Sequence, residues 1–260
     1  MNAAPARNHP WLPLMLLMLA LPIVLLLLYF NAATSAFQLL GLSPQGAALL
    51  LVASLVGSMI NIPLTRRRIA LAGSGMETTP TSLRQLMVWV HYYPPAVTEE
   101  VVAINVGGAI VPILFSVYLL TRPGAPLLGA GLATLAVAVV SKLLARPVTG
   151  VGITLPSFIP PLLAALAAIV VAKLLGSTAI APVAYVAGAI GTLIGADLLN
   201  LPLVLRGGLL SAAPQRIWRL GPRVPGPNQP RILSIGGAGI FDGIFLTAVV
   251  APLLAGLAIH

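Results

Sequence analysis

Two aspartates lie inside long apolar stretches of this sequence, where a carboxylate is costly and is therefore a candidate for function. Asp197 follows Gly195 and Ala196 near the end of one apolar run, and Asp242 lies in the last run. The chain has five acidic residues in all, so two of the five fall in segments that we expect to be buried in lipid. Two carboxylates held close together tend to share one proton, which lets one act as a base and the other as an acid.

The composition indicates what kind of scaffold must position these acids. The chain has 260 residues, of which 58% are hydrophobic and 7% charged, with a mean hydropathy of +1.03. A soluble domain is usually about one quarter charged, so the composition predicts a polytopic membrane protein. The absence of cysteine excludes disulfides and thiolate chemistry. We expect no cofactor and no metal, because His9, His91 and His260 are far apart in the sequence.

The apolar runs predict an all-α bundle of about seven transmembrane helices in a single membrane domain, residues 1–260. The predicted helices cover residues 12–30, 39–64, 99–120, 125–141, 153–175, 180–205 and 235–259. The first run exceeds the apolar core of a signal peptide, so we expect an uncleaved helix. The second connection, residues 65–98, contains a candidate interfacial helix with apolar residues at helical spacing, and residues 206–234 form a basic loop rich in proline and glycine.

The basic residues predict the orientation of the bundle. With seven spans, the amino terminus and alternate connections hold all fourteen basic residues except Arg122 and Lys173. The positive-inside rule then places the amino terminus in the cytoplasm and the carboxyl terminus outside. The net charge of +9 is therefore explained by topology, and we expect no nucleic-acid partner. The bias fits a multi-pass protein of a prokaryotic inner (plasma) membrane.

Both acids are expected at similar depth, about 10–12 Å inside the cytoplasmic helix ends at about 1.5 Å per residue. Asn105 is expected at the same level, and Asn200 on the same face as Asp197. Gly239 and Gly243 share the face of Asp242, where they would let another backbone approach. Gly191 and Gly195 form a second such pair, on which the sixth helix is expected to pack. We therefore take Asp197 and Asp242 as candidate catalytic residues, and the substrate-binding candidates are Asn105, Asn200, Gly239 and Gly243.

The last two runs resemble the GxGD-type intramembrane aspartyl proteases in having an Asp on each of two adjacent helices, with glycine before the acid. This resemblance implies that Asp197 and Asp242 form a catalytic dyad that cleaves transmembrane peptides. The sequence departs from that pattern because Ala196 replaces the tyrosine before the first acid, and Asp242 follows Gly239 by three residues. The whole chain is more similar to a family of prokaryotic membrane proteins that carries no assigned activity.

Two other functions fit the same residues. Paired carboxylates at one depth, an intramembrane Asn and helices interrupted by proline and glycine are typical of proton- or cation-coupled transporters. Alternatively, the aspartates hold helices together in a non-catalytic assembly protein. The expected partners are the lipid bilayer and either a transmembrane peptide or a transported ion, and the sequence does not indicate the oligomeric state.

Overall fold

The fold is mostly helical and contains helices suited to a membrane. The computed structural model describes residues 11–71, 96–148, 152–156, 158–206, 231–237 and 243–257. Three helices among them are long and apolar enough to cross a bilayer, namely Leu17–Leu39, Leu127–Leu144 and Ile180–Leu205. Four shorter apolar helices accompany them, which supports the expectation of a helical membrane protein.

Helices form most of the described chain, and three of them are π-helical, with wider turns than an α-helix. The α-helices are α1 (Leu12–Leu39), α2 (Pro44–Gly57), α4 (Val111–Leu120), α5 (Leu127–Leu144), α6 (Ile159–Leu175), α7 (Ile180–Val186), α8 (Leu201–Arg206) and α9 (Gly243–Leu257). The π-helical segments are η1 (Val106–Ile110), η2 (Ala187–Gly191) and η3 (Leu193–Leu198). The helix predicted over 180–205 is thus α7, η2, η3 and α8 in succession.

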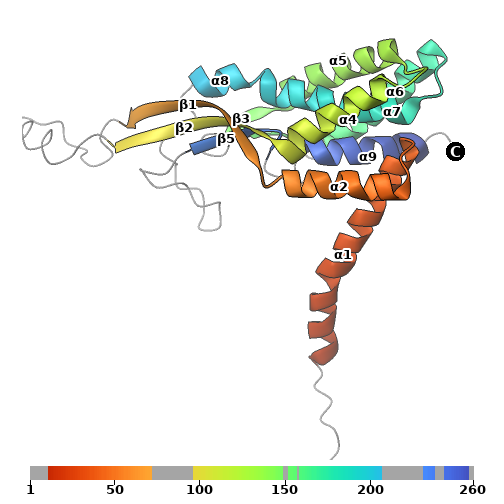
Figure 1. The fold of residues 1–260 in the computed structure, drawn as a ribbon, viewed down its shortest axis with the longest axis horizontal. Helices are drawn as coiled ribbons and strands as arrows, with labels where there is room; N and C mark the ends of the chain where they lie inside the picture. The colour runs from red at the N-terminus through yellow and green to blue at the C-terminus, as the bar shows by residue number, and fades with distance from the viewer. Residues whose placement is uncertain are drawn as a thin grey trace, which may run out of the picture.

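The strands of the described residues gather near one end of the helices (Figure 1). They are β1 (Asn61–Leu71), β2 (Ala96–Asn105), β3 (Arg146–Val148), β4 (Gly152–Thr154) and β5 (Arg231–Ile235). β1 pairs antiparallel with β2, β2 pairs parallel with β5, and β3 and β4 form a separate antiparallel pair. The register places Asn61 opposite Asn105, at the base of the larger sheet where it meets the helices.

The strands correct four of the predicted helix boundaries. Residues 61–64, 99–105, 153–154 and 235 were expected to be helical and lie in strands. Glu99 and Glu100, for example, are paired residues of β2. The prediction was wrong because an apolar run alone does not distinguish a buried strand from the end of a helix. Residues 72–95, which contain the candidate interfacial helix, and 207–230 of the basic loop lie outside the described residues.

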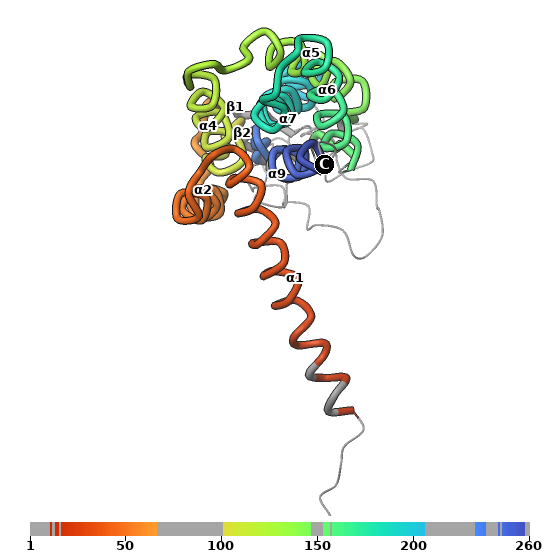
Figure 2. Tube along the Cα trace, turned by 90° about the vertical axis from the view of Figure 1, so that its right-hand side faces the viewer, coloured from red at the N-terminus to blue at the C-terminus, as the bar shows by residue number. Residues whose placement is uncertain are grey.

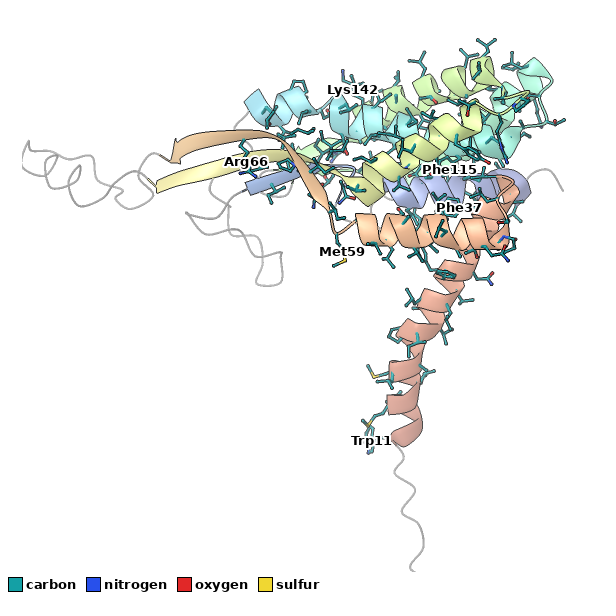
Figure 3. All side chains as sticks on the ribbon, viewed as in Figure 1. Trp11, Phe37, Met59, Arg66, Phe115 and Lys142 are labelled. Atoms are coloured by element: carbon teal, nitrogen blue, oxygen red, sulfur yellow. The ribbon has the colours of Figure 1, made fainter. Side chains whose placement is uncertain are left out.

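An aromatic cluster and small residues fill the core of the bundle. Phe115 of α4 contacts Phe37 of α1 and Tyr185 of α7 edge-on, with ring centroids 5.8 and 5.0 Å apart. Figure 3 places Phe37 and Phe115 inside the bundle, whereas Trp11 lies at the far end of α1. The amino-terminal part of α1 is exposed and projects away from the other helices (Figure 2). A helix that is apolar all round needs an apolar environment, such as the interior of a membrane.

Glycines bring η2 and η3 into direct contact with the backbone of α5. A Cβ atom on Gly191 would lie 2.8 Å from Cβ of Val137, and one on Gly195 would overlap the carbonyl oxygen of Ala138. The expectation that this helix packs by its Gly191 and Gly195 face is therefore confirmed. Close backbone approach of this kind gives membrane helices a large van der Waals contact.

Replacing Gly195 by alanine should destabilise the protein because the new methyl group has no room against α5. We expect Gly195→Ala to lower the free energy of unfolding in detergent by about 1–3 kcal/mol, the usual cost of overpacking. Gly131→Ala is the matched control, because a Cβ at Gly131 of α5 meets no atom within 4 Å. The control should be neutral or stabilising by up to about 1 kcal/mol. Equal stability of the two variants in thermal or chemical unfolding would contradict the close packing.

Candidate functional site

Asp197 joins the helix that carries it to the turn after β5. Its Oδ2 atom accepts a hydrogen bond of 2.7 Å from the backbone N–H of Gly236. Asp197 lies in η3 and is partly buried, within the apolar span Ile180–Leu205. A bond from a backbone N–H to a carboxylate is stronger than one between neutral groups, so this contact holds the carboxylate in place.

Two glycines make the turn that meets Asp197. Gly236 and Gly237 have φ angles of 86° and 68°, in the left-handed region that favours glycine. A side chain on Gly236 would also lie 2.6 Å from Cβ of Ala109, and one on Gly108 would overlap the carbonyl oxygen of Gly236. The turn after β5 is therefore packed directly on the backbone of η1. Gly236 thus packs on η1 while its backbone N–H donates to Asp197.

Asn105 is buried where β2 ends and η1 begins. Its Oδ1 accepts a 2.7 Å bond from the N–H of Gly108, and its Nδ2 donates to the carbonyl oxygen of Ser58 at 2.8 Å. The same Nδ2 donates to Oδ1 of Asn61 at 3.1 Å. These three bonds link α2, β1 and η1, so the amide predicted to bind substrate is engaged within the fold.

Asn61 and Ser234 extend this network towards Asp197. Asn61 Oδ1 lies 2.6 Å from the Ser234 hydroxyl, which is also 2.9 Å from the carbonyl oxygen of Gly237. The network therefore reaches the turn at Gly236 and Gly237, in which the backbone N–H of Gly236 donates to Asp197. Sequence reasoning missed both residues, although each is a polar residue at the edge of an apolar run.

Asn200 caps the end of the helix that carries Asp197. It is buried, and its Nδ2 donates to the carbonyl oxygens of Gly195 and Ala196, each at 3.0 Å. Those carbonyl groups would otherwise lack partners at the helix end. Its amide nitrogen is thus directed at its own backbone, whereas the sequence predicted that this side chain binds substrate.

For the second predicted acid, Asp242, the structure describes only residues that flank it in the sequence. Asp242 and Gly239 lie outside the described residues, and Gly243 is the first residue of α9. Residues 231–235 form β5, so the prediction that the last helix begins at residue 235 is wrong. The predicted depth of about 10–12 Å for Asp242 assumed that helix start, so it loses its basis.

Comparison with known families covers most of this architecture. A family model described as "Protein of unknown function (DUF1614)" matches residues 55–254. The chain belongs to this family. The DUF1614 segment contains both aspartates and leaves α1 outside it. No curated protein and no solved structure matches the chain, and no similarity to intramembrane proteases emerges.

Removing the Asn105 amide should destabilise this DUF1614 protein. Asn105→Ala leaves the Gly108 N–H and the Ser58 carbonyl without these partners, at a cost of roughly 2–4 kcal/mol. Asn31→Ala is the matched control, because Asn31 is an exposed residue of α1, and it should change stability by less than about 0.5 kcal/mol. Chemical unfolding in detergent measures both. A loss no larger than that of the control would show that the three bonds contribute little.

Proposed function

We propose that the protein is a membrane-embedded aspartyl hydrolase whose dyad is Asp197 and Asp242. The hydrogen bond from Gly236 N–H to Asp197 carries this proposal. It attaches the helix of the first acid to the glycine-rich segment that leads, six residues later, to the second acid. Chain connectivity supports the proposal that the two carboxylates lie in one region of the molecule.

The proposed chemistry is hydrolysis of a peptide bond without a metal or a covalent intermediate. One carboxylate takes a proton from water as the water oxygen attacks the carbonyl carbon, and the other acid donates a proton to the carbonyl oxygen. The C–N bond then breaks, and the amine leaves with a proton returned from the dyad. Gly239 and Gly243 have no side chains to obstruct a peptide backbone, which supports their role beside Asp242.

We further propose that the bundle crosses a prokaryotic inner membrane seven times, with the amino terminus in the cytoplasm. The distribution of basic residues supports this orientation. Arg66 lies in β1 and Arg146 in β3, so both belong to strands near one end of the helices (Figure 1). Arg122 lies in the connection between α4 and α5, which leads away from those strands.

Transport of a proton or cation is the second candidate function, and the interrupted helices favour it. Asp197 lies in a π-helical segment, Asn105 lies where a strand becomes a π-helix, and Gly236 follows a strand. Transporters bind ions where helices are broken and backbone groups are freed from regular bonding. The same aspartates would then form the ion site.

Loss of either acid should abolish cleavage if the dyad is catalytic. We expect purified protein to cleave a generic transmembrane peptide in detergent, and Asp197→Asn or Asp242→Asn each to reduce the rate at least about 10³-fold, because the dyad acts as a unit. Glu99→Gln makes the same acid-to-amide change in β2 and should retain activity. Cleavage that survives either substitution would eliminate the hydrolase proposal.

Flux measurements separate transport from hydrolysis. If the acids serve transport, wild-type protein in liposomes should move protons or cations down an imposed gradient, and Asp197→Asn should reduce that flux about tenfold or more while Glu99→Gln does not. Flux equal to that of empty liposomes would eliminate this candidate. If the protein neither cleaves the peptide nor changes the liposome flux, a non-catalytic assembly role is the function that remains.

A further inference from the structure

The exposed apolar surface of helix α2 continues beyond the helix into strand β1. α2 ends at Gly57, and the side chains of Met59, Ile62 and Leu64 that follow are 85%, 44% and 55% exposed. Figure 3 shows Met59 on the outside of the junction between α2 and β1, with Arg66 further along the strand. Large exposed apolar patches mark surfaces that contact a membrane or another protein.

The length of α2 indicates which partner this surface has. α2 has 14 residues, which at about 1.5 Å per residue give about 21 Å, whereas the hydrocarbon core of a bilayer is about 30 Å thick. The helix alone is therefore about 9 Å too short to cross. An extended chain rises about 3.3 Å per residue, so residues 61–64 of β1 add about 13 Å. Helix and strand together are long enough to cross, and the exposed apolar side chains continue over this distance.

Strand β5 of the same sheet lies beside a helix of membrane-spanning length. Leu233 of β5 is buried against Val204 of α8, which belongs to the apolar span Ile180–Leu205. The turn after β5 meets the same span through the bond from Gly236 N–H to Asp197. β2 joins β5 to β1, so the base of the sheet lies at the level of the last residues of this span.

The backbone around the start of β1 meets the condition that a lipid environment sets. Backbone groups at membrane depth must find partners within the protein, because no water is present there. The Ser58 carbonyl oxygen accepts from Asn105 Nδ2, and the Ile60 carbonyl oxygen accepts from a backbone N–H of η1 at 3.0 Å. β1 then pairs with β2, and Pro63 has no N–H to satisfy. Apolar side chains can therefore contact lipid here while these backbone groups stay paired.

Arg66 marks the end of this apolar surface. It is exposed, and the register pairs it with Val101, which carries no charge. An arginine at a membrane boundary directs its guanidinium group to the lipid headgroups. β1 is an edge strand of the described sheet, and an open edge suits the boundary between acyl chains and headgroups rather than the centre of the bilayer.

We propose that the base of the larger sheet lies within the lipid bilayer at this boundary. The exposed apolar side chains between Met59 and Leu64 contact acyl chains, and Arg66 lies at the level of the lipid phosphates. β1 thus completes the membrane crossing that α2 begins. The inference rests on the proposed membrane crossing, and it does not depend on whether the aspartates serve hydrolysis or transport.

A fluorescent probe on single cysteines tests this placement, because the chain has no cysteine of its own. The full-length variants Ile62→Cys and Leu64→Cys are labelled and reconstituted in phosphatidylcholine vesicles, with and without bromine on the acyl chains. Bromine quenches fluorophores that it contacts. We expect both probes to be quenched at least about half as strongly as a probe on Leu49→Cys of α2, which faces the hydrocarbon core.

Two control positions make the outcome decisive. Leu49 is 72% exposed on α2 and reports contact with acyl chains, whereas Thr178 is exposed in the short connection between α6 and α7 and reports water. Quenching at Leu49 with no more quenching at Ile62 and Leu64 than at Thr178 would overturn the inference and leave the proposed crossing intact. Absence of quenching at Leu49 as well would overturn both.

Reactivity of the unlabelled cysteines checks the result without a bulky probe. The thiolate is the reactive form, and an apolar layer disfavours it, so Ile62→Cys in vesicles should react with a water-soluble maleimide at least about tenfold more slowly than Thr178→Cys. Equal rates in the folded protein would also overturn the inference.

Discussion

Backbone N–H and C=O groups that are buried in this structure need hydrogen-bond partners. The side-chain amide of Asn105 supplies such partners at the junction of α2, β1 and η1. Where β2 becomes η1 and where α2 ends, backbone groups leave one regular pattern before the next begins. Water is scarce in an apolar protein, so a side chain must supply the bonds. Asn105 does so with an acceptor for Gly108 N–H and donors for Ser58 O and Asn61. These bonds join α2, β1 and η1 at the base of the sheet.

Glycine sets the distances between the parts that this amide connects. Gly107 lies against the backbone of α2, where the Ser54 hydroxyl bonds its carbonyl oxygen at 2.7 Å. Gly108 lies against Gly236, and Gly195 lies against α5. Each contact is too close for a Cβ atom, so backbones rather than side chains form these interfaces. Close backbone contact leaves little freedom of movement, which suits a region that must hold a carboxylate in a defined position.

These constraints meet at the carboxylate of Asp197. Asp197 belongs to η3, which Gly195 packs against α5. The backbone N–H of Gly236, in the turn after β5, donates a hydrogen bond to the Asp197 carboxylate. Hydrolysis and ion transport both require an acid held in this way, and they differ in what approaches it. The hydrogen bonds of Asn61 and Ser234 reach the same turn, through the carbonyl oxygen of Gly237.

The amino-acid sequence by itself determined the class of the protein and the residues worth testing. Hydropathy predicted the apolar helices, and the spacing of Gly191 and Gly195 predicted the face that packs on α5, because both signals are local. The boundaries at residues 61–64 and 99–105 required the tertiary structure, since a strand depends on a partner that is remote in the chain. The roles of Asn105 and Asn200 and the bond between Asp197 and Gly236 were also decided there. A polar side chain in an apolar segment indicates that a partner exists, but only the folded chain determines which backbone group comes within 3 Å of it.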